Sequence, residues 1–317
     1  MNVSTIESFN ITSGFLVYEK VKEKIIEHFG FTISKNNYNH NSMSQLVASR
    51  TSMKPTGVFS SNFLYILFTN GVNYQGNTTS GYQEITAITI EPKVSNSYET
   101  SSSNIFSSTN TQLYISNLDN KLYVIKNENS IIFINRAGDL YSILKITITD
   151  DLLLVNSNYG VRSGSGTSSS PYGLGKMRIC PSYVYVSGEN STIYYCSSLF
   201  KYIDGTITDT LKPLSTLTLQ SSTRFSNEYN KITSFISPTF CFDLTTTAQK
   251  NLFVKPLDGN TTNYQVLALE DKDYGIVNMQ LMKPEEEFII GAKKYIVFPS
   301  GTFSFISQNV GIVLRIL

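Results

Sequence analysis

The fold is decided by residues 113–148, which read LYISNLDNKLYVIKNENSIIFINRAGDLYSILKITI. Four short apolar segments follow one another in this stretch, at 113–115, 122–125, 131–134 and 140–148. The residues between them are rich in Asn, Asp and Gly, which favour tight turns. Short apolar segments separated by turn residues at a spacing of about nine predict an antiparallel β-meander.

Strand patterns continue on both sides of this meander. On the N-terminal side, 63–69 and 85–90 are predicted strands, and Asn70-Gly71 predicts a tight hairpin turn with a return strand from Val72. The predicted strands on the C-terminal side are 151–155, 183–186, 193–196, 200–203, 206–211, 235–244, 288–291, 294–299 and one within 303–317. Asp204-Gly205 and Asp258-Gly259 predict two further hairpin turns. The three turns are unevenly spaced, which argues against a propeller or a solenoid.

One amphipathic helix is predicted near the N-terminus, with Ser13 as its N-cap and Gly30 just after its end. Its apolar residues recur at spacings of three and four: Phe15, Tyr18, Val21, Ile25 and Phe29. Two interpretations remain open. The helix packs on its own domain, or it docks on a neighbouring subunit through Phe15, Tyr18 and Ile25.

Residues 34–57 are polar and weakly patterned, which predicts a linker or an extended arm. We therefore expect a helix with a polar arm over 1–57 and a β-rich region over 58–317. A Gly/Ser-rich stretch at 160–170 leaves open whether that region divides into two subdomains near 158–175. The predicted fold class is mainly β, an antiparallel sandwich or barrel-like sheets with one N-terminal helix and a polar arm.

The composition favours protein contacts over contacts with nucleic acid or membranes. Charged residues make up 15% of the chain, and 25 basic residues balance 24 acidic ones to a formal charge of +1. This balance provides no electrostatic footprint for DNA, RNA or an anionic membrane. A surface with few charges loses little hydration when it is covered by another protein, so extensive protein contact is the favoured interpretation.

The cysteines and the chain start carry no targeting or metal signal. Cys180, Cys196 and Cys241 are odd in number and without CxxC spacing, so we expect small buried side chains. A Cys180–Cys196 disulfide stays open. No basic segment with a following apolar run opens the sequence, and no run of about 18 apolar residues occurs. We therefore expect synthesis in a cytoplasm and no membrane span.

No motif points to a catalytic or cofactor site. His28 and His40 are the two histidines, and no nucleophile-elbow motif accompanies them. A phosphate-binding loop at 173–177 fails because Met177 follows the lysine where Ser or Thr is needed. The sequence predicts no enzyme activity, no cofactor and no metal.

Acidic residues leave a polysaccharide-cleaving enzyme as a third interpretation. Glycoside cleavage needs two carboxyl groups roughly 5–9 Å apart. The candidates include Asp150, Asp151, Asp204 and Asp243, and the enzyme interpretation uses Asp150, Asp151 or Asp204. The acidic triplet Glu285-Glu286-Glu287 follows Pro284 and is interpreted as a solvated turn before a strand.

Residues 287–299, EFIIGAKKYIVFP, resemble the endings of virion structural proteins of tailed bacteriophages. In those proteins a short hairpin of the form I-G-x-K-x-Y-I-V-F-P precedes a final strand, here within 301–317. The resemblance implies a neck, tail-tube or tail-completion role in the virion, with synthesis in the host cytoplasm. It also implies a cyclic homo-oligomer that contacts other virion structural proteins. The alternative is a host-recognition or glycan-binding tail protein, more often trimeric, that uses loops such as 160–170.

Overall fold

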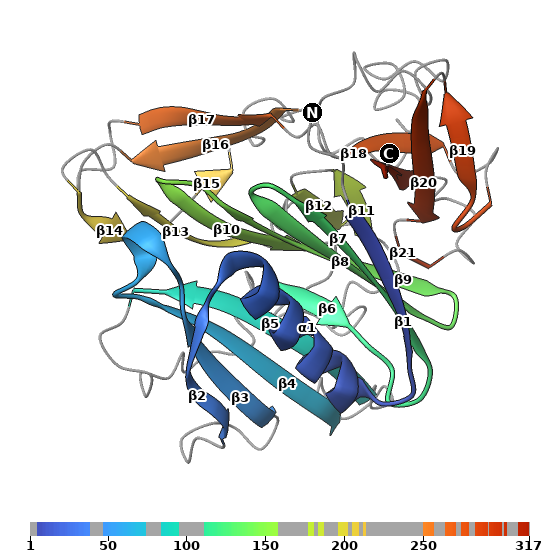
Figure 1. The fold of residues 1–317 in the computed structure, drawn as a ribbon, viewed down its shortest axis with the longest axis horizontal. Coiled ribbons are helices and arrows are strands. Elements are labelled where there is room, and N and C mark those ends of the chain that lie inside the picture. Colours follow the sequence, from blue (N-terminus) through green and yellow to red (C-terminus); the bar gives the residue numbers. More distant parts are fainter. Residues whose placement is uncertain are drawn as a thin grey trace.

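The computed structural model is mainly β, with antiparallel sheets and a single α-helix in its described part, which confirms the predicted fold class (Figure 1). The structure describes residues 5–38, 47–73, 84–94, 111–157, 177–180, 183–186, 196–201, 205–208, 212–213, 250–256, 264–270, 274–278, 283–290, 292–299, 301–302 and 310–316. None of the helical turns in these residues has the length and apolar character that crossing a bilayer requires.

The central sheet has eight strands, and the predicted meander forms its middle. In spatial order the strands are β1 (Thr5–Ile11), β7 (Asn120–Asn127), β8 (Ser130–Ala137), β9 (Leu140–Ile148), β10 (Leu152–Ser157), β13 (Cys196–Lys201) and β14 (Ile207–Thr208), with β21 (Gly301–Thr302) paired to β9. Gly138 has a φ of 62° in the β8–β9 turn, and Gly205 has a φ of 90° between β13 and β14. Both turns fall where Gly-containing turns were predicted.

A five-stranded sheet faces the central sheet. Its strands are β2 (Thr32–Tyr38), β3 (Val47–Lys54), β4 (Phe63–Asn73), β5 (Glu84–Lys93) and β6 (Gln112–Tyr114), and the 3₁₀ turn η1 (Gly57–Phe59) precedes β4. The chain then passes to the central sheet. Asn120 supports this crossing, since its Oδ1 accepts the Ser116 N–H at 2.7 Å and its Nδ2 donates to the Ser116 carbonyl at 2.8 Å. The predicted segment 113–115 thus belongs to a different sheet from the three that follow it.

A four-stranded sheet lies on the other face of the central sheet. Its order is β18 (Tyr274–Asn278), β22 (Val310–Arg315), β20 (Lys293–Pro299) and β19 (Glu287–Ile290). The β19–β20 hairpin followed by a final strand is the arrangement predicted for 287–317. The remaining strands are β11 (Met177–Cys180) with β12 (Tyr183–Val186), and β15 (Lys212–Pro213), β16 (Lys250–Pro256) and β17 (Tyr264–Glu270).

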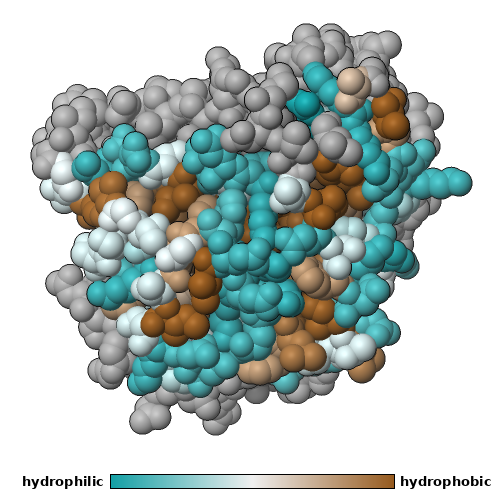
Figure 2. All heavy atoms as spheres, in the orientation of Figure 1, coloured by the Kyte–Doolittle hydropathy of each residue, from teal (hydrophilic) through white to brown (hydrophobic). Residues whose placement is uncertain are grey.

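Helix α1 (Gly14–Phe29) has the predicted bounds. It begins after Ser13, whose carbonyl accepts the Val17 N–H at 3.1 Å, and ends at Gly30, which has a left-handed φ of 68°. A Cβ on Gly14 would lie 3.1 Å from the Ser116 carbonyl oxygen, so the helix start is pressed against the sheet crossing. In Figure 2, hydrophilic side chains cover the middle of the face in view, where α1 lies.

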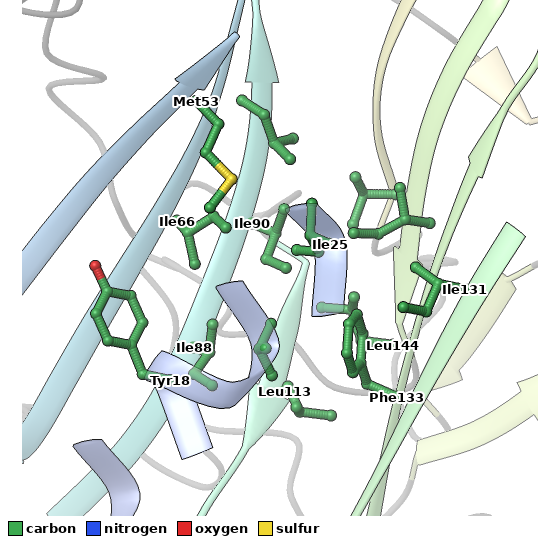
Figure 3. Close-up of a cluster of buried hydrophobic side chains, with 14 of the residues drawn as sticks. Tyr18, Ile25, Met53, Ile66, Ile88, Ile90, Leu113, Ile131, Phe133 and Leu144 are labelled. Atoms are coloured by element: carbon green, nitrogen blue, oxygen red, sulfur yellow. The ribbon is translucent and has the colours of Figure 1, made fainter. Parts of the chain in front are cut away.

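The main core lies between the five-stranded sheet and the central sheet, with α1 filling one side of the gap (Figure 3). The helix contributes Val17, Tyr18, Val21 and Ile25, all without exposed surface. The strands contribute Met53, Leu64, Ile66, Phe68, Ile88, Ile90, Leu113, Leu122, Val124, Ile131, Phe133, Leu144, Ile146, Leu153 and Val155, among others. The helix therefore packs on its own domain, which is the first of the two interpretations.

A second core lies on the opposite face of the same strands. Successive side chains of a strand point to opposite faces, so Leu122 and Val124 enter the first core while Tyr123 and Ile125 enter the second. The β8 segment at 131–134 divides in the same way and is buried on both faces. The C-terminal sheet covers this side with Ile296, Phe298, Leu314 and Ile316.

The expected polar arm is wrong, because residues 32–38 and 47–54 form β2 and β3. Polar side chains fill positions that usually hold apolar ones, and partners on the sheet and helix satisfy them. Thr51 has no exposed surface, and its Oγ1 lies 2.6 Å from the Tyr18 hydroxyl. The hydroxyls of Tyr38 and Ser52 lie 2.5 Å apart. Hydrophobic periodicity cannot detect strands of this kind. Strand β1 also went unpredicted.

The predicted turn at Asn70-Gly71 is also wrong. Strand β4 continues through it to Asn73, and a register shift between Thr69 and Val72 accommodates the extra residues as a bulge. Beyond the shift, Val72 still pairs with Ile85. The predictions at 160–170, 235–244 and Asp258-Gly259, and those on His40 and Cys241, lie outside the described residues.

Candidate functional site

Glu285 lies where the C-terminal sheet meets the central sheet. Its N–H donates to the Val297 carbonyl at 2.8 Å, and the Val297 N–H donates back to the Glu286 carbonyl at 3.1 Å, so the turn 283–286 is fixed to β20. The backbone φ of Glu285 is 63°, a left-handed value that non-glycine residues rarely adopt. Strain of this kind persists only where the surroundings hold the residue in place.

Four side chains from three neighbouring strands converge on the Glu285 carboxylate. Lys121 Nζ donates to Oε2 at 2.7 Å, while Arg136 Nη1 and the Tyr141 hydroxyl each donate to Oε1 at 3.0 Å. The Tyr123 hydroxyl donates to Oε2 as well. We call these five residues the Glu285 clasp.

The register of the meander brings the clasp together. Lys121 is paired directly with Arg136, and Arg136 with Tyr141, so the three side chains form a row across β7, β8 and β9 on one face. Tyr123 is two residues beyond Lys121 and shares that face. The row is therefore a consequence of the same turns that set the strand pairing.

In the clasp the Glu285 carboxylate is ionised, and the Tyr123 and Tyr141 hydroxyls are protonated. Burial alone would raise the pKa of Glu285, but hydrogen bonds from Lys121, Tyr123, Tyr141 and Arg136 outweigh it and lower the pKa to about 2. Burial raises the pKa of Tyr123 and of Tyr141, and the Glu285 charge raises both further. An efficient general acid or base has a pKa near the working pH. Near pH 7 the clasp therefore suits docking of two sheets and not proton transfer.

A cavity of about 370 Å³ opens beside the clasp. It is lined by Asn10, Ile11, Thr12, Asp119, Asn120, Lys121, Arg136 and Gly138. Lys121 and Arg136 reach both the cavity and Glu285, and Asp119 adds an exposed carboxylate to the lining. The lining thus offers donors and acceptors of both signs to a small polar group.

A second charge network ties the helix to the edge of the central sheet. Lys24 lies 2.6 Å from Glu7 and 2.7 Å from Glu27, and Lys126 lies 2.6 Å from each of the same two carboxylates. Hydrogen bonds from Lys126 and Lys24 lower the pKa of Glu27 to about 2. Burial opposes the charge of Lys24, but Glu27 and Glu7 raise its pKa to about 12. The network fixes α1 against β1 and β7.

Strand β1 is a terminal strand of the central sheet and a candidate interface. Seven consecutive residue pairs join it to β7 without a register shift, from Thr5 with Lys126 to Ile11 with Asn120. No described strand pairs with its outer edge. Thr5, Ser8 and Asn10 are exposed. An edge of this length and regularity can accept a further strand through its backbone.

The predicted site residues lie in different surroundings. Tyr18 and Ile25 have no exposed surface, so neither side chain is accessible to a neighbour while α1 occupies its own core. Phe15 is 39% exposed and contacts Phe68, with ring centroids 5.6 Å apart. Of the predicted helix contact, only the Phe15 end is on the surface.

The acidic candidates are dispersed. Asp150 and Asp151 are exposed at the β9–β10 turn, where the Asp151 carbonyl accepts the Lys201 N–H at 2.9 Å. Asp204 lies outside the described residues. The interpretation of the acidic triplet as a solvated turn is wrong for Glu285, whose side chain is 16% exposed and fully bonded.

The sequence predicted neither a histidine-dependent active site nor a metal site, and His28 is the histidine that the structure describes. Burial lowers the pKa of His28, whose ring lies 4.5 Å from that of Phe29 on the helix. The described residues contain no cluster of three His, Cys, Asp or Glu side chains arranged to hold a metal ion.

The sequence carried a partial signal for the clasp. Lys121 and Tyr123 alternate on one strand, and Arg136 and Tyr141 flank the next turn, so a polar row on one face of the meander could have been read from the pairing. The carboxylate that joins it is more than 140 residues further along the chain. Comparison of the sequence with protein-family models and with curated proteins finds no match.

Proposed function

We propose that this chain is a non-enzymatic structural protein that works through contacts with copies of itself and with neighbouring proteins. The observation that carries the proposal is the outer edge of β1 in the central sheet, which no described strand covers and which has seven regular residue pairs behind it. Soluble proteins usually protect such edges because exposed backbone donors and acceptors recruit other chains. An unprotected regular edge is therefore expected where pairing is part of the function.

Most other described edges are short or irregular, with the exception of β17, whose seven residues pair with β16 without a register shift. Strand β2 has register shifts on both sides of Lys35, and Asn37 in it has a φ of 44°. Strands β14, β6 and β19 have only two, three and four residues. Bulges, lysines and short length are the usual protections of sheet edges. Within the central and five-stranded sheets, β1 is thus the described edge strand that lacks bulges, lysines and short length.

The proposed setting is the neck or tail of a tailed bacteriophage, and its support is the resemblance of residues 287–299 together with the low charge of the chain. In the structure, Phe288 stacks on Tyr295 with ring centroids 5.4 Å apart, and Ile289 points outward with 71% exposure.

The proton positions in the clasp also favour a non-enzymatic role. A glycosidase needs one carboxyl group that is protonated near the working pH. Glu285 has a pKa of about 2, and the hydroxyls of Tyr123 and Tyr141 stay protonated. The Glu285 carboxylate, with its four donors, is thus set to hold two sheets together.

The test is the native mass of the purified protein by light scattering, combined with negative-stain images of the same sample. We expect a closed homo-oligomer with cyclic symmetry. A protein that stays monomeric at every concentration, and also with candidate virion partners, would contradict the proposal.

A second candidate function is glycan recognition by a tail protein, and the observation that favours it is the cavity beside the clasp. Asn10, Thr12 and Asp119 could bond sugar hydroxyls there. Binding of purified host surface polysaccharide, lost in an Asp119→Ala variant and kept in a Glu286→Gln variant, would favour this candidate. A compact trimer in the images would point the same way.

A further inference from the structure

We infer that the partner at the β1 edge is a second copy of this chain, which pairs β1 with β1 in antiparallel orientation across a two-fold axis at Ser8. This inference rests on the proposed function, since it names the occupant of the edge that carries it.

Length restricts the edges that can take part. Only β1, β2 and β17 have seven residues among the described edge strands; β2 is interrupted twice, and β17 is regular but belongs to a separate three-stranded sheet. Strand β14, at the far edge of the same sheet, has two residues, so head-to-tail extension of the central sheet would rest on a very short contact. Pairing of β1 with its own copy uses the long regular edge on both sides.

Symmetry restricts the register. A two-fold axis perpendicular to the sheet keeps each side chain on its face, so odd-numbered residues must pair with odd-numbered ones and even with even. The axis then passes between the two copies of one residue, which are paired with each other. With the axis at Ser8, Thr5 pairs with Ile11, Ile6 with Asn10, and Glu7 with Phe9, so all seven residues of the strand take part.

Neighbouring registers are worse. An axis at Glu7 would place the two Glu7 carboxylates directly opposite each other, and like charges in that position destabilise a sheet. An axis at Phe9 would leave Thr5 and Ile6 beyond the end of the partner strand. The Ser8 register is therefore the one with full overlap and without a like-charge pair.

Charges beside the strand complement this register. Lys20 Nζ lies 5.0 Å from the centre of the Phe9 ring, and Lys24 Nζ lies 5.4 Å from it. Since Glu7 of one copy is opposite Phe9 of the other, each carboxylate, already 2.6 Å from Lys24 and Lys126 of its own copy, would also approach the lysines of the partner helix. Attraction of opposite charges across the axis occurs twice in one symmetric contact.

Both faces of the sheet continue across the contact. Phe9 and Ile11 pack against the first core, whereas Ile6 packs against the second. Pairing at Ser8 adds Ile11 of one copy beside Thr5 of the other on the first face, and Ile6 beside Asn10 on the second. The partner strand thus extends an existing three-layer arrangement. Such a two-fold contact closes after two copies.

Two single-cysteine variants test the register. In the Ser8→Cys variant the two introduced cysteines lie directly opposite each other, with Cα atoms roughly 4.5–5.5 Å apart, which a disulfide can bridge. In the Asn10→Cys variant the two cysteines are offset by four residues, roughly 13 Å along the strand, which a disulfide cannot bridge. Both positions are exposed, so folding should be retained.

The readout is the fraction of covalent dimer on a non-reducing gel after mild oxidation, with the unmodified chain as the background for its three native cysteines. We expect at least a fivefold larger dimer fraction for Ser8→Cys than for Asn10→Cys. Equal fractions, or no dimer of Ser8→Cys from a protein that is oligomeric by native mass, would overturn this inference and leave the proposed function standing. A protein that is monomeric and forms no disulfide would overturn both.

Discussion

The two faces of the central sheet are covered in different ways. On one face, α1 and the five-stranded sheet bury 23 hydrophobic residues in a continuous cluster within the described part of the chain. On the other face, the C-terminal sheet shares a cluster of ten, and the Glu285 clasp completes the contact. The same strands, β7, β8 and β9, supply both faces. The first layer is thus held by apolar burial, and the second by a smaller apolar contact together with one ionised carboxylate.

The two layers should therefore respond differently to pH. Apolar burial is insensitive to pH, whereas a salt-bridged carboxylate contributes only while it is ionised. We therefore expect the C-terminal layer to open under conditions that leave the first layer intact. Substitutions in each layer test this separation.

The largest effect is expected from Phe133→Ala, which empties the centre of the first core. Phe133 has no exposed surface, and loss of its ring should lower the free energy of unfolding by about 3–5 kcal/mol. Urea unfolding measures this loss.

The matched change on the second face is Phe298→Ala, which removes a ring 4.8 Å from that of Tyr123. It should raise amide exchange in β20 and β22 while β4 and β5 stay protected. Equal loss of protection on both faces would refute the separation.

Glu285→Ala should have the next largest effect. It leaves Lys121 and Arg136 without their shared carboxylate, and we expect a loss of about 2–3 kcal/mol in the docking of the C-terminal layer. The control in the same triplet is Glu287→Gln, which breaks an exposed 2.6 Å ion pair with Lys294 and should cost less than about 1 kcal/mol. Amide exchange in β20 reports both. If the two variants behave alike, the clasp does not hold the layer.

Acid should reproduce the loss of Glu285 in the unmodified protein. The pKa of Glu285 is about 2 in the folded protein and 4.5 when unperturbed, so the lowered value makes its contribution complete above pH 4.5. The contribution is lost progressively as the pH falls from 4.5 toward 2. Near-ultraviolet circular dichroism of the clasp tyrosines follows the transition. A Glu285→Gln variant should show a smaller change in this range, and an identical change would point to other carboxylates.

Tyr18→Phe should have a smaller effect, on the first face only. The variant keeps the ring in the core and removes the hydroxyl that lies 2.6 Å from Thr51 Oγ1. Since Thr51 retains the Asn36 Oδ1 acceptor at 2.9 Å, we expect a loss of about 1 kcal/mol. Thermal unfolding measures it. A loss above about 3 kcal/mol would mean that the polar strand β3 depends on this one bond.

The smallest effect on stability is expected from Ser8→Lys combined with Asn10→Lys. Both side chains are exposed, so the free energy of unfolding should change by less than about 0.5 kcal/mol. Lysines on a sheet edge oppose pairing with another strand, so the native mass should fall to that of the monomer. Ser34→Lys, on the bulged edge β2, is the control and should leave the native mass unchanged. The opposite pattern would move the contact to another edge.

The sequence predicted the parts of the fold that are governed by local periodicity. Helix α1 and strands β7, β8 and β9 follow from apolar spacing and turn residues. Strands β2 and β3 could not be found this way, because Arg50, Thr51 and Ser52 are buried polar residues. The polar partners of Thr51 and Ser52 come from distant segments. The turn expected at Asn70-Gly71 failed because the pairing with β5 extends past it and absorbs it as a bulge.

The sequence could predict the meander side of the Glu285 clasp but not Glu285 itself. Lys121, Tyr123, Arg136 and Tyr141 belong to the meander that the sequence showed, so their common face follows from strand alternation. Glu285 is placed by long-range docking and by a left-handed backbone that nothing in its local sequence requires. The edge at β1 was missed for the same reason, since Thr5 to Ile11 become a strand only by pairing with residues 120–126.

Because β7, β8 and β9 are buried on both faces, the two faces are covered at different times during synthesis on the ribosome. Their first face can be covered once residue 155 has emerged, because α1 and the five-stranded sheet precede them in the chain. Their second face must wait for Ile296 and Phe298. At ordinary synthesis speeds this delay is roughly ten to thirty seconds. During that time Tyr123, Ile125, Ile132 and Ile134 present an apolar surface to solvent, and such transiently exposed surface favours aggregation of the half-made chain.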